Sequence, residues 1–197
     1  MASTTAWEKR LNVSTRAEWR EWLQKNAASA SYCWITVSMK PVPGKLLYLD
    51  AVEEALCAGW IDGMKQKGPD HSLLQRMSPR KQGSSWTELN KERARRLKRL
   101  GLMESAGRRA LPDMGRDSFA IDPAILQKLK EDPGVYANFL GFPELYTRIR
   151  IDTIQSVKRQ PELFAKRLEK FIARTRENHM YGQWHDDGRL LGTDESG

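Results

Sequence analysis

The sequence predicts an α+β fold, in which a small, mainly antiparallel sheet packs with helices and is followed by an all-helical C-terminal region. Apolar and polar residues alternate over 32–39, which is typical of a half-buried strand. Two more strands are predicted over 60–66 and 72–78, joined by a loop around Gly68-Pro69-Asp70. From Asp122-Pro123 onward the chain shows the caps, prolines and apolar spacing of successive helices.

Helices are also expected between and after the predicted strands. Thr15–Glu18 and Ser85–Glu88 both fit a capping box, in which a hydroxyl and a carboxylate satisfy free amides at a helix start. A further helix is predicted from Asp50 to Gly59, since glycine is a common helix stop. The helix that opens at Ser85 is basic and ends near Gly101, and a shorter helix follows over 103–111.

Prolines divide the C-terminal part into separate helices. They stand at Pro133, Pro143 and Pro161, and the closing segment after the last helix has no clear period. We therefore expect two regions: an α+β core with a basic helix over residues 1–115, and a helical region with a tail over residues 116–197.

Composition argues against several classes of protein. The 197-residue chain has no apolar run of roughly 20 residues that would span a bilayer, and its N-terminus lacks the apolar core of a signal peptide. Its two cysteines, Cys33 and Cys57, lie in apolar contexts and are expected to be reduced core thiols of a cytoplasmic protein. The three histidines have no recognised ligand spacing, so neither a metal nor a cofactor is expected.

Positive charge is concentrated in one segment. Between Arg76 and Arg109 there are eleven Lys/Arg and three Glu, which accounts for the whole net charge of +8. Such a segment either binds a polyanion or is a solvated helix face. An anion site is also expected beside the helix start at Ser85, where backbone amides lie near arginines. The candidate anion-binding residues are Arg76, Arg80, Lys81, Lys91, Arg95, Lys98 and Arg99.

Asp62 is the most unusual acid of the sequence, because it lies between bulky apolar residues and a glycine in Gly59-Trp-Ile-Asp-Gly63. Arg93 lies on the helical stripe expected to face the core, and a buried guanidinium needs an acceptor. Asp62 is the partner that we expect for Arg93. The pair either ties the helix to the sheet or takes part in catalysis, and both readings stay open. The stripe comprises Trp86, Leu89 or Asn90, Arg93, Leu97 and Leu100.

Glu53 and Glu54 precede Asp62 on the predicted second helix. Carboxylates gathered near a cleft can hold a cationic substrate or move protons. Glu53 is also a candidate cap, and Glu54 a candidate exposed residue. Cys57 is a conceivable nucleophile, but burial is the better interpretation, because no histidine is near it in sequence.

Several blocks of the chain stand out together, and they are Tyr48–Cys57, Gly59–Gly63, Gln75-Arg76, Ser78–Arg80, Ser85-Trp86, Asn90, Arg93, Ile154–Pro161 and Arg167–Lys170. These blocks resemble the signature of the YdeI/OmpD-associated (OmdA-like) family. Bacterial members are described as bacteriocin-protection or stress-associated proteins, without settled catalytic residues, so the resemblance implies little chemistry. The segment from His179 to Leu191 departs from them and resembles filamentous-fungal relatives.

A second likeness is an analogy without an aligned motif. The fungal arginine-containing cyclodipeptide synthases are also small, basic and cofactor-free, and use aminoacyl-tRNA. By this analogy the basic helix would hold tRNA phosphates, and acids would clamp an arginyl guanidinium. Asp62, Glu54 and Arg93 would then be catalytic. The substrate-binding residues would be Glu53, Trp34, Trp60, Trp86, Asn90 and Ser85.

Three functions follow as hypotheses. The leading one is tRNA-dependent acyl transfer that forms an arginine-containing cyclic dipeptide, with aminoacyl-tRNA or another polyanion as partner. The alternative is a non-catalytic stress or bacteriocin-protection factor that binds an anionic partner through Arg76–Arg109. General RNA binding is the third.

Overall fold

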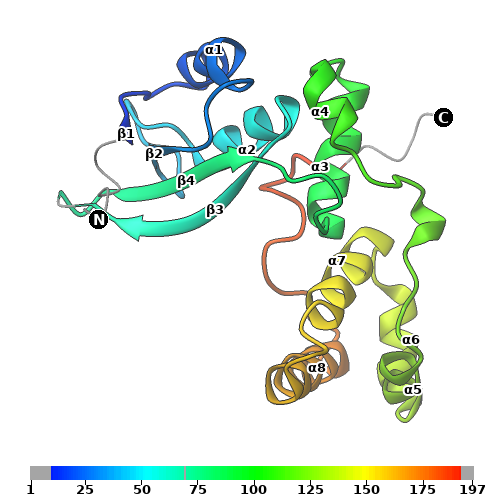
Figure 1. Cartoon of the computed structure of the whole chain (residues 1–197). Helices are drawn as coiled ribbons and strands as arrows, with labels where there is room; N and C mark the ends of the chain where they lie inside the picture. The colour runs from blue at the N-terminus through cyan, green and yellow to red at the C-terminus, as the bar shows by residue number, and fades with distance from the viewer. Residues whose placement is uncertain (1–9, 69, 192–197) are drawn as a thin grey trace. The chain divides into compact units, whose positions relative to one another are not determined.

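The computed structural model describes residues 10–68 and 70–191, and its elements are shown in Figure 1. They form two compact units. The first comprises the described residues up to Ser84 together with Arg93–Pro112, and the second comprises Ser85–Glu92 and the described residues from Asp113 onward. In the described ranges, no helix is long and apolar enough to cross a membrane.

The first unit contains the sheet that the sequence predicts. Its strands are β1 (Arg10–Leu11), β2 (Cys33–Val37), β3 (Trp60–Lys67) and β4 (Leu73–Pro79), in the order β1-β2-β4-β3. The pairs β2–β4 and β3–β4 are antiparallel, and the short β1 runs parallel to β2. The predicted small, mainly antiparallel sheet is therefore confirmed, with β1 as an addition.

Two helices supply the core of this unit, α1 (Arg16–Asn26) and α2 (Tyr48–Cys57). The capping box at Thr15 is confirmed, since the Thr15 hydroxyl accepts from Glu18 N–H while the Glu18 carboxylate accepts from Thr15 N–H. Trp19 is fully buried and donates from its indole N–H to Ala51 O at 3.0 Å, which joins α1 to α2.

The prediction that α2 starts at Asp50 is wrong. The helix begins at Tyr48, with Leu47 as an N-cap that makes no side-chain hydrogen bond. Asp50 instead lies in the first turn and accepts a hydrogen bond from Arg16 at 3.1 Å. A long-range ion pair has thus replaced the local capping role that the spacing suggested.

Helix α3 (Glu88–Arg99) begins three residues after the predicted cap at Ser85. Thr87, immediately before the helix, accepts a hydrogen bond from Asn90 N–H at 3.2 Å. Arg93 is buried, as the predicted stripe requires, but Leu100 is 54 % exposed, so the core-facing stripe ends before Leu100.

Helix α4 (Ser105–Arg109) packs closely on α2 in the first unit. A Cβ at Gly107 would lie only 2.2 Å from Cys57 O. Glycine is therefore required at this position, because any side chain would push the two helices apart.

The second unit is helical beyond α3, as the sequence predicts. Its helices are α5 (Pro123–Lys130), α6 (Pro133–Gly141), α7 (Glu144–Gln155) and α8 (Pro161–Arg176), with a short 3-10 turn at Arg116–Ser118. Asp122 and Asp132 cap α5 and α6, and each helix has proline in its first turn. These local signals begin the two helices where the sequence predicts them.

Part of the C-terminal tail belongs to the core of this unit. Trp184 is 8 % exposed and packs edge-to-face on Tyr146, with ring centroids 5.5 Å apart. The irregular sequence suggested a loosely docked tail, but in its described part, up to Leu191, Trp184 is anchored in the core of the unit.

Candidate functional site

Glu54 of α2 is engaged by two arginines of α1. Its side chain is 3 % exposed. Arg20 holds it in a bidentate pair, with Nε–Oε2 and Nη2–Oε1 distances of 2.7 Å, and Arg16 Nε lies 2.5 Å from Oε1. Burial favours the neutral acid, but these hydrogen bonds outweigh it and lower the pKa of Glu54. Glu54 is therefore a buried anion stabilised by two guanidinium groups.

Glu53 is held in the same network. It is 2 % exposed and pairs with Arg16 Nη1 and Arg96 Nη1, both at 2.9 Å. The chain's own guanidinium groups thus occupy the positions beside Glu53 and Glu54 in which an arginyl substrate was expected. These contacts tie α1 and the second half of α3 to α2.

Asp62 of β3 has a different environment. It stands opposite Met77, a core residue, and therefore lies on the sheet face that α2 covers. The Tyr48 hydroxyl donates to Asp62 Oδ2 at 2.6 Å. Burial lowers the pKa of Arg80, and the attraction of Asp62 partly offsets this effect, so the two charges interact. The pairing of Asp62 with Arg93 stays a prediction.

Tyr48 connects Asp62 to one more cation. Lys65 Nζ lies 4.1 Å from the centroid of the Tyr48 ring, in cation–π geometry. Asp62 and Tyr48 are half-buried, while Lys65 is exposed. This small polar cluster at the edge strand β3 presents a half-buried carboxylate beside an exposed lysine.

The candidate tryptophans of the first unit lie on opposite faces of the sheet. Trp60 is 1 % exposed, contacts Trp19 and Trp22 edge-to-face, and donates to Ala27 O, so it is a core residue. Trp34 alternates with the core residues of β2 and hence lies on the opposite face of the sheet. The remaining candidates Ser85, Trp86, Asn90 and Lys91 belong to the second unit.

Both cysteines are free and buried. Burial raises the pKa of Cys33 to about 12 and that of Cys57 to about 12. The thiolate is the reactive form, so neither group is suited to act as a nucleophile at neutral pH. This agrees with the interpretation of Cys57 as a core residue.

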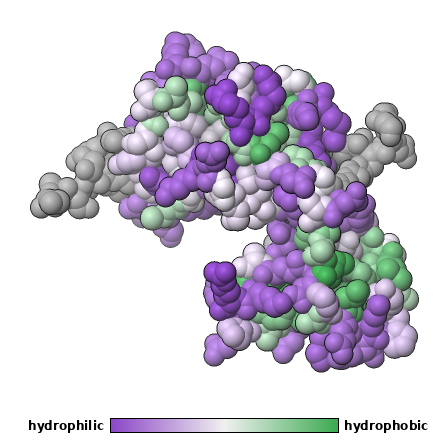
Figure 2. All heavy atoms as spheres, turned by 45° about the vertical axis from the view of Figure 1, so that its right-hand side comes forward, coloured by the Kyte–Doolittle hydropathy of each residue, from purple (hydrophilic) through white to green (hydrophobic). Residues whose placement is uncertain are grey.

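The basic segment divides into engaged and exposed side chains. Arg76 stacks 4.5 Å from the Tyr32 ring centroid, and Arg80 donates to the Ser84 hydroxyl. Arg95 is half-buried. Figure 2 shows hydrophilic residues with small hydrophobic patches on the side of the first unit that faces the viewer. The exposed cations of the segment are Lys81, Lys98, Arg99, Arg108 and Arg109. Of these, Arg108 also donates to Met103 O and to the Ser105 hydroxyl.

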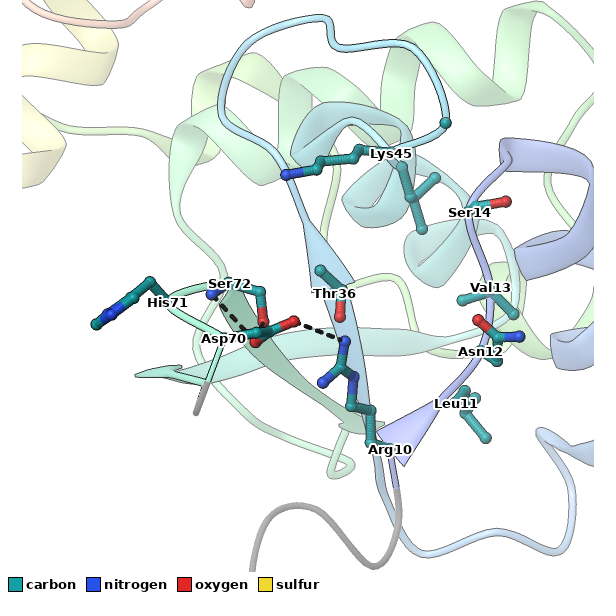
Figure 3. A pocket seen from close by; sticks show the side chains of 12 residues that line it. Arg10, Leu11, Asn12, Val13, Ser14, Thr36, Lys45, Asp70, His71 and Ser72 are labelled. Atoms are coloured by element: carbon teal, nitrogen blue, oxygen red, sulfur yellow. Dashed lines mark hydrogen bonds and ion pairs between the residues drawn. The ribbon is translucent and has the colours of Figure 1, made fainter.

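One hollow of the first unit was not anticipated from the sequence. It has a volume of about 570 Å³ and lies beside β1 and β2, under the loop that leads to α2 (Figure 3). Arg10 and Asp70 lie on one side of it in an ion pair of 3.5 Å, and Lys45 lies on another. Thr36 of β2 lies between these charges. Their separation along the chain explains why no sequence motif signals this pocket.

In the second unit a buried arginine joins two helices. Arg148 of α7 is 5 % exposed and pairs with Glu92 at 2.7 Å, Glu88 at 3.3 Å and Glu144 at 2.9 Å. The Asp152 carboxylate of the same helix accepts a hydrogen bond from Glu88 N–H. This cluster ties α7 to the first part of α3, because the buried Arg148 guanidinium pairs with carboxylates of both helices. Among the residues described, no group of three or more His, Cys, Asp or Glu side chains is arranged to hold a metal ion.

Most of the first unit matches a known protein family. Residues 11–110 match the family described as a domain of unknown function (DUF8412), which covers just over half of the chain. The chain belongs to the DUF8412 family. A second match, over residues 118–178, is to the family described as bacteriocin-protection, YdeI or OmpD-associated. No curated protein and no solved structure matches the chain.

The sequence blocks that resemble the YdeI/OmpD-associated family are distributed over both matched regions. The blocks from Tyr48 to Arg93, which include Asp62, lie in the DUF8412 region. Only Ile154–Pro161 and Arg167–Lys170 lie in the region similar to the YdeI/OmpD-associated family. The resemblance therefore applies to the helical part of this DUF8412 protein, and the sheet, the acid network and the pocket fall in a region without assigned function.

Proposed function

We propose that this protein is a non-catalytic protection or stress factor, which binds an anionic macromolecule through exposed basic side chains of α3 and α4. The similarity of residues 118–178 to the bacteriocin-protection family supports the general class. The observation that carries the binding surface is the exposure of Lys98 and Arg99 at the end of α3 and of Arg108 and Arg109 at the end of α4, all in the first unit.

The acids of the first unit favour a binding partner for these cations over ion pairs within the protein. The buried carboxylates Glu53 and Glu54 are already paired with Arg16, Arg20 and Arg96. Lys98 and Arg99 also complement the negative end of the α3 dipole, but that effect contributes only about 0.3–1 kcal/mol. A polyanion would gain several contacts at once, with binding that weakens steeply as salt is added.

The test is charge reversal with a matched control. The double variant Lys98→Glu/Arg99→Glu is compared with Arg159→Glu/Lys166→Glu, which changes the net charge equally at exposed positions of the second unit. Binding to uncharged tRNA, aminoacyl-tRNA and duplex DNA is measured by fluorescence anisotropy across salt concentrations. We expect the first variant to lose binding and the control to keep it. Equal losses in both would refute a localised surface.

A catalytic function, the formation of an arginine-containing cyclic dipeptide from aminoacyl-tRNA, rests on the Asp62–Tyr48 pair. This half-buried carboxylate is the one candidate acid outside the buried arginine network. Its test is incubation with tRNA, arginine, a second amino acid and the matching synthetases, followed by mass spectrometry for a diketopiperazine. Absence of product with every amino acid would leave binding as the function.

A further inference from the structure

The pocket beside β2 contains a polar group that the described residues do not satisfy. Thr36 Oγ1 is buried and has no hydrogen-bond partner among them. A buried hydroxyl without a partner is uncommon in proteins and usually has a reason, such as a bound ligand or water. Figure 3 shows the Thr36 side chain on the strand that crosses the middle of the pocket.

Charges on both sides of Thr36 favour a negative group. Arg10 lies on one side, where Asp70 partly offsets it through their 3.5 Å ion pair. Hydrogen bonds from the hydroxyl and N–H of Ser72 lower the pKa of Asp70 to about 2, so this acid is ionised at neutral pH. Lys45 also lines the pocket and has no ion-pair partner in the described part of the chain. The pocket therefore has a surplus of positive charge near Lys45.

The size of the pocket is suited to an organic group. Leu11 and Val13 border the side away from Asp70 (Figure 3), but their side chains pack against the core of the first unit, which also contains the buried Leu46. A volume of about 570 Å³ is in the usual range for sites of small molecules.

We propose that this pocket binds a small organic anion, whose phosphate or carboxylate lies against Thr36 between Arg10 and Lys45. The Thr36 hydroxyl donates to the anion, and the two cations supply charge-assisted contacts. This site is separate from the basic surface of α3 and α4, and it takes a small molecule instead of a macromolecule.

The experiment measures the melting temperature with inorganic phosphate, glycerol 3-phosphate, succinate and, as the neutral control, glycerol. A ligand that binds the folded state raises the melting temperature as its concentration increases. We expect a rise with at least one anion and none with glycerol, and the effective anion identifies a phosphate or a carboxylate ligand. A chain that responds to none of the anions, or equally to glycerol, would overturn the proposal.

Two variants locate the site. Thr36→Val removes the unpartnered hydroxyl, so the free protein should melt at the same or a higher temperature while its Kd for the anion rises about tenfold. Lys45→Gln should also weaken binding about tenfold, whereas Lys40→Gln, at an exposed lysine of the same loop that does not line the pocket, should not. If Thr36→Val and Lys45→Gln bind as tightly as the unmodified chain, the anion does not occupy this pocket.

Discussion

Replacing Glu54 with glutamine tests whether the buried acids of α2 are structural. The change removes the charge that receives three short hydrogen bonds from Arg16 and Arg20. Breaking one side of a buried ion pair costs about 3–5 kcal/mol. Arg16 keeps Asp50 and Glu53, and Arg20 is 43 % exposed and can be hydrated. We therefore expect the lower end, a loss of about 3 kcal/mol in the free energy of unfolding.

Urea unfolding followed by tryptophan fluorescence measures this loss, because Trp19 and Trp60 lie in the same unit. The matched control is Glu21→Gln on α1, whose pair with Lys25 is exposed at both ends. That pair should contribute less than about 1 kcal/mol. A Glu54→Gln protein within 0.5 kcal/mol of the unmodified chain, a threshold of roughly the usual effect of surface changes, would refute the structural assignment.

The Glu54→Gln variant also predicts how the free energy of unfolding depends on pH. The pKa of Glu54 is lowered in the folded state, so its contribution is fully present above the unfolded pKa of about 4.3. The contribution is lost as the pH falls through the lower folded value. The difference in unfolding free energy between the unmodified chain and Glu54→Gln should therefore shrink below about pH 4. A difference that stays constant from pH 7 to pH 3 would contradict this linkage.

Three further predictions concern other clusters. Asp62→Asn should cost about 1.5 kcal/mol in urea unfolding if Tyr48 is its main partner, whereas a loss of about 3–5 kcal/mol would indicate a buried pair with Arg93. Arg148→Met should destabilise the chain by about 3–5 kcal/mol, because buried glutamates of α3 lose their partner; a change below 1 kcal/mol, roughly a surface-pair effect, would contradict it. Trp184→Ala should cost about 3–5 kcal/mol and expose the tail to proteolysis, and unchanged protease resistance would show that the tail is held elsewhere.

The sequence predicted those features whose signals are local. Alternation identified β2, and the Thr15–Glu18 spacing identified the start of α1. The caps at Asp122 and Asp132 act within one helical turn and were recognisable for the same reason. Where a distant partner competes, the local rule failed, as at Asp50, which pairs with Arg16 and does not start α2.

The candidate site shows the same division. The acids at 53 and 54 were identified as candidate site residues, yet their partners Arg16 and Arg20 lie more than thirty residues away in the chain. No spacing rule connects such positions. The pocket around Thr36 likewise draws its charges from Arg10 and Lys45, which belong to separate segments.

By itself the sequence determined the α+β class, the succession of β2, β3, β4 and the helices along the chain, the basic segment and the buried state of the cysteines. These depend on periodicity, capping and composition, which act over a few neighbouring residues. The tertiary structure decided which charges neutralise one another: Glu53 and Glu54 are used internally, while Lys45 and the cations from Lys98 to Arg109 face solvent. Pairing depends on distances of a few ångströms between remote residues, and only the folded chain sets those distances.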